Sequence, residues 1–169
     1  IADPLFKEAK RAAGQAGVMR ARQPMEKVLA DPRTPPALRQ QLLEVDAALL
    51  FARLELALPA SESYRHYADL KRPYVVWNVF AAPEFSLEPR EWCYPVAGCT
   101  AYRGWFSEAR ARESAAELAA RGYDVFVGGV AAYSTLGWFD DPVLSTMLGE
   151  DETGLAGLLF HELAHQRLY

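Results

Sequence analysis

His161-Glu162-Leu163-Ala164-His165, close to the end of the 169-residue chain, is the stretch that decides how the fold is interpreted. If it is helical, the two histidines lie on one face a turn apart, so that both imidazoles reach the same cation. Glu162 lies about 100° around the helix from His161, where it can contact a water on that cation without ligating the cation. The spacing H-E-x-x-H is typical of zinc-dependent hydrolases, with the glutamate as general base.

The residues around this motif predict the helix that it needs. Asp151 or Thr153 can cap the start of a helix over residues 154–169. In an alternative interpretation, His161 and His165 are polar members of a core helix. We favour the metal site because these are two of only three histidines in the chain and stand among leucines. The leucines recur at helical spacing, at Leu155, Leu158, Leu159, Leu163 and Leu168.

The composition is that of a folded, weakly acidic protein. Hydrophobic residues make up 51% of the chain and aromatic residues 12%, which is enough to build a core. A length of 169 residues suits a single domain. The net charge of −4 argues against nucleic acid as the main partner. No apolar run approaches the length of a transmembrane helix, and the start of the chain lacks a signal-peptide pattern.

The periodicity predicts an α+β protein, with a helical N-terminal half packed on a small sheet and the H-E-x-x-H helix at the C-terminus. Residues 1–58 form the helical segment and residues 59–169 the α+β portion. The expected helices cover residues 5–22, 25–29, 36–56, 108–121 (capped by Ser107) and 142–148. The expected strands cover residues 73–81 and 123–127, with one or two more between 92 and 106.

Gly128 and Gly129 follow the last expected strand, which they interrupt, and lead into a loop that contains Tyr133. Glycines let another backbone approach a strand closely, and a strand edge can hold an extended substrate by β-augmentation. These three residues are therefore candidate substrate-binding residues, with the Tyr133 phenol able to stabilise an oxyanion. A tight turn with a packed tyrosine explains the same residues without any catalytic role. His66 has no metal-binding partner nearby, and we expect it in a loop or on the surface.

The two cysteines, Cys93 and Cys99, are not spaced as in a zinc ribbon. The residues alone leave two alternatives open, a local disulfide in an exported protein or two buried thiols in a cytosolic one.

Several longer stretches, from about Pro24 onward, resemble a family of predicted bacterial zinc aminopeptidases of the zincin type, often exported or lipid-anchored. The most specific stretches are residues 72–86, 96–104, 122–148 and 157–166. The resemblance implies a zinc enzyme that acts on peptides, with His161 and His165 as ligands and Glu162 as base. It also implies a periplasmic location in the cell envelope, a lipid anchor upstream of this chain, and pairing of Cys93 with Cys99.

One departure from the family concerns the third metal ligand. Members of the family continue beyond this helix, with an asparagine-glutamate pair on a later helix, whereas the sequence here stops at Tyr169. We therefore expect a copy truncated after the motif helix, with the third ligand missing and little or no activity. Asp140 or Asp141 could substitute, although their simpler role is to cap the helix expected at Pro142. The alternatives are a non-catalytic envelope binding or scaffold domain with an incomplete metal site, and a metal hydrolase for a non-peptide substrate.

Overall fold

The computed structural model describes residues 14, 16–59, 62–94, 98–132, 135, 139–149 and 152–168. Helices and strands are both present, so the expected α+β class is confirmed. The chain groups into two compact units, each made of two separate segments. Unit 1 is Ile1–Gly14 with Pro73–Ala131, and unit 2 is Gln15–Arg72 with Ala132–Tyr169. The expected single domain over residues 1–169 stays a prediction.

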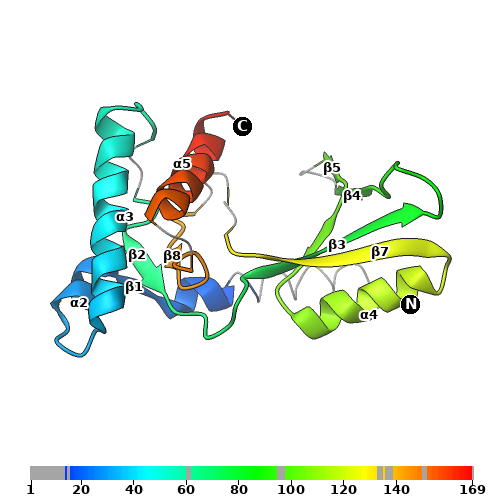
Figure 1. Cartoon of the computed structure of the whole chain (residues 1–169), viewed down its shortest axis with the longest axis horizontal. Coiled ribbons are helices and arrows are strands. Elements are labelled where there is room, and N and C mark those ends of the chain that lie inside the picture. Colours follow the sequence, from blue (N-terminus) through cyan, green and yellow to red (C-terminus); the bar gives the residue numbers. More distant parts are fainter. Residues whose placement is uncertain are drawn as a thin grey trace. The chain divides into compact units, whose positions relative to one another are not determined.

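Unit 1 is built on a three-stranded antiparallel sheet. Its central strand is β3 (Val76–Pro83), with β6 (Arg103–Trp105) on one side and β7 (Tyr123–Val130) on the other. β7 pairs with all eight residues of β3. Helix α4 (Glu108–Ala119), which connects β6 to β7 along the chain, lies along one face of this sheet (Figure 1).

The two faces of this sheet differ because strand side chains alternate between them. Trp77, Val79 and Ala81 of β3 are buried and form a core with Ala111 and Leu118 of α4. The other face carries Phe80, whose ring centroid lies 5.6 Å from that of Tyr102 and 6.1 Å from that of Phe126. All three of these rings are exposed, so α4 covers one face of the sheet only.

A short hairpin of β4 (Trp92–Tyr94) and β5 (Gly98–Thr100) completes unit 1. Cys93 and Cys99 are register partners across this hairpin and are joined by a disulfide. The sequence left open whether Cys93 and Cys99 form a disulfide or are two buried thiols, and the structure contains the disulfide. The region from 92 to 106 holds three short strands, β4, β5 and β6, and not the one or two expected.

Unit 2 contains a small mixed sheet in the order β1-β2-β8. β2 (His66–Ala68) is central, antiparallel to β1 (Arg22–Pro24) and parallel to β8 (Val143–Leu144). The expectation that His66 lies in a loop or on the surface is wrong, because the residue belongs to the central strand and is half-buried.

The helices of unit 2 are α2 (Met25–Ala30), α3 (Pro36–Leu54) and α5 (Glu152–Leu168). These confirm three of the expected helices. α3 starts with Pro36, whose missing N–H costs nothing in the first turn. The buried stripe of α3 packs against α5 (Figure 1) and consists of Leu42, Val45, Leu49 and Ala52. Residues 16–21 are helical, while the rest of the helix expected at residues 5–22 lies largely outside the described residues.

Among the residues that the structure describes, no helix has both the length and the apolar character needed to cross a bilayer.

The helix expected at residues 142–148 is wrong, and with it the capping role of Asp140 and Asp141. Val143 and Leu144 form β8, followed by turns over residues 145–149. Both side chains are buried, and β8 pairs with the backbone of β2. The Ser145 hydroxyl accepts the Leu70 N–H, and the Ser145 N–H donates to the Ala68 carbonyl. These long-range bonds outweigh the local helix signal of Pro142.

Two further details differ from the sequence-based expectation. β7 runs without interruption through Gly128 and Gly129, because β3 pairs with them at Asn78 and Trp77. Ser107 occupies the N-cap position of α4, but its side chain makes no capping hydrogen bond. Gly122 lies just beyond the helix with a φ of +81°, a conformation that glycine adopts without strain.

Candidate metal centre

The H-E-x-x-H motif lies in the second half of α5, which packs into unit 2 through its leucines. Leu155, Leu159 and Leu163 are fully buried at a spacing of four residues. Phe160 contacts Phe51 of α3, with ring centroids 5.9 Å apart. This packing fixes the helix along one side and turns the arc of His161 toward solvent.

The two motif histidines point their imidazoles at a common point. Their Nε2 atoms are 3.0 Å apart, and the ring planes are nearly perpendicular at 88°. Two imidazole nitrogens that share a tetrahedral zinc ion at the usual Zn–N distance of about 2.05 Å lie about 3.3 Å apart. His161 is exposed and His165 half-buried. The donor set therefore fits two of the ligands of a zinc ion that is open to solvent.

Glu162 points away from solvent, with 7% of its surface exposed. Burial raises the pKa of its carboxyl, the nearby imidazoles of His161 and His165 oppose the rise, and the charge of Asp141 adds to it. A buried carboxyl with a raised pKa is the kind of group that can take part in general acid–base chemistry.

Asp141 is a second buried carboxyl whose charge acts on Glu162, whereas the sequence analysis considered it only as a helix cap or a substitute ligand. It is 3% exposed, and its carboxylate accepts hydrogen bonds from the Thr135 N–H (2.8 Å) and hydroxyl (2.9 Å). Its backbone carbonyl accepts the N–H of Tyr64. Burial raises the pKa of Asp141, and the Thr135 hydrogen bonds oppose this. The residues around the motif therefore include a second buried carboxyl, held in one orientation.

A family model described as "Putative aminopeptidase" matches residues 8–169 of the chain. The chain belongs to this family. The family description implies a peptidase and confirms the expected aminopeptidase resemblance at this level. No curated protein and no solved structure matches the chain.

A third metal ligand for this member of the aminopeptidase family does not lie among the described residues. No described Cys, Asp, Glu or additional His offers a ligand atom that clusters with the nitrogens of His161 and His165. One cluster of three residues that can bind metal, Glu91 with Cys93 and Cys99, lies in unit 1. Its sulfur atoms form the disulfide and are not thiolates, so this cluster is not a zinc site.

The candidate substrate-binding residues lie in the other unit or outside the described residues. Gly128 and Gly129 belong to β7 of unit 1, and Tyr133 is outside the described residues. Aromatic rings occupy the space that side chains on these glycines would need. A Cβ on Gly129 would overlap the Tyr74 ring, and one on Gly128 would meet the Phe126 ring at 2.9 Å. This packing explains the glycines, and their role in substrate binding stays a prediction.

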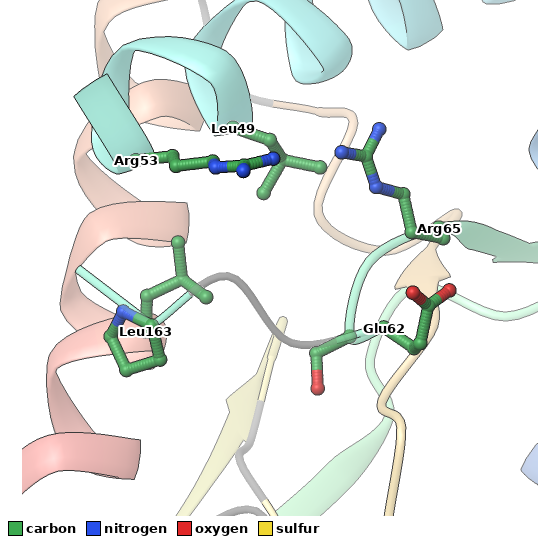
Figure 2. Close-up of a pocket in the computed structure, with 7 residues that line it drawn as sticks. Leu49, Arg53, Glu62, Arg65 and Leu163 are labelled. Atoms are coloured by element: carbon green, nitrogen blue, oxygen red, sulfur yellow. The ribbon is translucent and has the colours of Figure 1, made fainter. Parts of the chain in front are cut away.

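Figure 2 shows a pocket beside the motif helix α5, with Leu163 of that helix in its wall. The cavity is about 90 Å³ and is lined by Leu163 of α5, Leu49 and Arg53 of α3, and Glu62 and Arg65 ahead of β2. Leu163 is about 200° around the helix from His161. The cavity therefore belongs to the packing of α5 on α3, whereas His161 lies on the exposed side of the helix.

Proposed function

We propose that this member of the aminopeptidase family is a zinc-dependent peptidase of the zincin type. His161 and His165 are its metal ligands, and Glu162 is its general base. The observation that supports this most directly is the 3.0 Å separation of the two imidazole Nε2 atoms, close to the spacing that a shared zinc ion requires. The family description supplies the substrate class, a peptide with a free N-terminus.

His161 and His165 would hold a zinc ion, which would supply Lewis-acid polarisation of the scissile carbonyl and a more acidic water. Glu162 accepts the proton of the attacking water and passes it to the leaving amine. Its burial directly beside the two imidazoles supports this role, because a base has to lie within reach of the water that it activates. The neighbouring Nε2 atoms of His161 and His165 would be the atoms that hold the ion. Gly128, Gly129 and Tyr133 stay candidates for contact with the peptide.

The disulfide between Cys93 and Cys99 supports a location in the periplasm or elsewhere in the cell envelope. Disulfides persist in oxidising compartments and are rare in the cytosol. A lipid anchor upstream of this sequence is part of the same proposal.

Zinc should bind the chain weakly, because stable sites have at least three protein ligands and the described residues supply two. This observation favours a second candidate function, a non-catalytic envelope domain with an incomplete metal site. Peptide turnover separates the two functions, because only the peptidase releases N-terminal residues in a zinc-dependent manner.

The test compares zinc binding and turnover of N-terminally free peptides between the native chain and three variants. His161→Ala should weaken zinc binding at least about tenfold, since it removes one of two ligands. Glu162→Gln should keep the zinc affinity and remove the zinc-dependent part of the turnover, which we expect to be low in the native chain, because the amide cannot accept the proton.

Gly157→Ala is the matched control on the same helix. The residue is exposed and a Cβ there meets nothing within 4 Å, so zinc binding and turnover should be unchanged. Zinc affinity that is the same in His161→Ala and the native chain would refute the metal site. Zinc-dependent turnover that survives Glu162→Gln would refute the role of the glutamate.

A further inference from the structure

A second pocket lies in unit 1, which does not contain the metal-binding motif. It has a volume of about 200 Å³ and is open to solvent, with room for one small solute. Its walls come from β4, β6, α4 and the segments next to them. The charged side chains in these walls are three arginines, Arg90, Arg103 and Arg121, and one carboxylate, Glu117. The pocket therefore carries an excess of positive charge.

Arg90 is held by aromatic stacking and not by a carboxylate. Its guanidinium carbon lies 5.7 Å from the ring centroid of Trp92 and 5.5 Å from that of Tyr123. Its Nε is buried without a hydrogen-bond partner among the described residues, and one Nη makes a long 3.5 Å contact with the Tyr123 hydroxyl. These cation–π contacts stabilise the charged guanidinium without a carboxylate, so its Nη groups keep hydrogen-bonding capacity for an anion.

The other two arginines extend this arrangement. Arg103 stacks on Trp105, with its guanidinium carbon 4.8 Å from the ring centroid. Arg121 follows α4 and stands four residues after Glu117, a spacing that favours an ion pair. Within the described part of the chain, however, neither Arg90 nor Arg121 pairs with a carboxylate.

Elsewhere on the same helix the arginines do find partners. Arg112 pairs with Glu108 at 2.7 Å, and Arg110 pairs with Glu113 at 3.4 Å. Arg90 and Arg121 thus differ from Arg110 and Arg112 on the solvated face of α4, each of which pairs with a glutamate.

We propose that this pocket binds a small molecule that carries an oxyanion, a phosphate or a carboxylate. Planar guanidinium groups match both oxyanions in a two-pronged geometry, and Arg is the residue that most often binds them in this way. The aromatic walls keep the guanidinium plane fixed before the ligand arrives, which lowers the entropy cost of binding. This inference is independent of the peptidase proposal, because it rests on side chains of unit 1 only.

The experiment titrates the native chain with inorganic phosphate and with benzoate, at constant ionic strength set by chloride. Binding is followed by calorimetry and by the NMR signals of the arginine Nε–H groups. We expect saturable binding of one equivalent of at least one probe, with a shift of the Arg90 Nε–H signal. Phosphate binding alone assigns the site to a phosphorylated ligand, and benzoate binding alone to a carboxylic acid.

Two exposed variants decide the question without disturbing the stacked Arg90. Arg121→Gln should weaken binding about tenfold, because it removes a charge-assisted hydrogen bond. Glu117→Gln should tighten binding several-fold, because it removes the carboxylate that repels the ligand. Arg112→Gln, on the solvated face of the same helix, is the matched control and should leave the affinity unchanged.

The absence of saturable binding of both probes to the native chain would overturn the proposal. An equal loss in Arg112→Gln and Arg121→Gln would also overturn it, since the effect would then be one of net charge. The same holds if Arg121→Gln and Glu117→Gln both bind as the native chain does.

Discussion

Asp141 shows how a buried carboxyl near the motif can cost stability at neutral pH. Burial raises its pKa, and the hydrogen bonds from Thr135 lower it without cancelling the effect of burial. The folded-state pKa of Asp141 is therefore above that of the unfolded chain, about 3.9. Its contribution to the free energy of unfolding is fully present below the unfolded-state pKa and is lost as the pH rises through the folded-state pKa. The Thr135 hydrogen bonds limit that loss.

Thr135→Val should destabilise the chain by about 1.5–3 kcal/mol at neutral pH, because the ionised Asp141 carboxylate loses the hydrogen bond that the Thr135 hydroxyl donates to it. The pKa of Asp141 should rise further, so the cost of the substitution should shrink in acid, where the carboxyl is protonated. Denaturant unfolding at about pH 4 and about pH 7 measures both effects.

Thr34→Val is the control for this substitution. The Thr34 hydroxyl donates to the neutral Val28 carbonyl at 2.6 Å. Its removal should cost about 0.5–1.5 kcal/mol at both pH values. If the two variants depend on pH in the same way, Asp141 is not the partner that matters.

Among single residues, those that could be identified from the sequence as candidate site residues are neighbours on one helix. His161 and His165 are one helical turn apart, so their spacing alone brings the imidazoles together. Asp141 belongs to a different element, and no spacing rule relates it to Glu162. Its pairing with Thr135 depends on a turn that local propensity does not specify.

Among the elements, β7 shows why two adjacent glycines can stand in a strand that stays intact. Glycine weakens a strand unless its missing side chain makes room for something else. Here that space is filled by rings, Tyr74 over Gly129 and Phe126 over Gly128. Tyr74 also contacts the buried Trp77 edge-on, with ring centroids 6.2 Å apart. The glycines therefore let large side chains cover a backbone that would otherwise be bare.

Gly129→Ala should destabilise the chain by about 1–3 kcal/mol, because the new Cβ overlaps the Tyr74 ring and forces it off Trp77. Gly128→Ala should cost less, because the Phe126 ring is 65% exposed and can turn into solvent. Chemical denaturation of the two variants gives the comparison. An equal and small cost at both positions would remove packing as the reason for the glycine pair.

Some helices and strands are determined by their own local sequence, and others only by pairing with distant parts of the chain. α3 and α5 could be predicted from their periodic leucines and from the proline at the start of α3, and both were found within a few residues of the expected ends. β8 could not, because a two-residue strand exists only through its pairing with β2. Pro142 gave the opposite signal, and the long-range backbone bonds of Ser145 outweighed it.

At the scale of the whole molecule, each compact unit is assembled from segments that are far apart in sequence. Unit 2 combines Gln15–Arg72 with Ala132–Tyr169, and the segment between them belongs to unit 1. The change from helical to strand-rich sequence near residue 58 does not coincide with the start or the end of the segment that lies between the two parts of unit 2. Neither end of that segment has a linker-like composition. The division into two units follows from which strands pair with one another. Sequence patterns predict single strands but do not predict their partners. As a result, the H-E-x-x-H motif and the arginine-lined pocket fall in different units.

This division predicts two separate footprints in hydrogen exchange. Zinc at about ten times its dissociation constant stabilises the state that binds it by about 1.4 kcal/mol, which slows amide exchange about tenfold wherever opening releases the metal. We expect that protection in α5 and in α3, against which α5 packs. Phosphate or benzoate should instead protect α4 and β4, whose residues line the oxyanion pocket. Protection by zinc that is confined to α4 and β4, or that persists in His161→Ala, would contradict a metal site on α5.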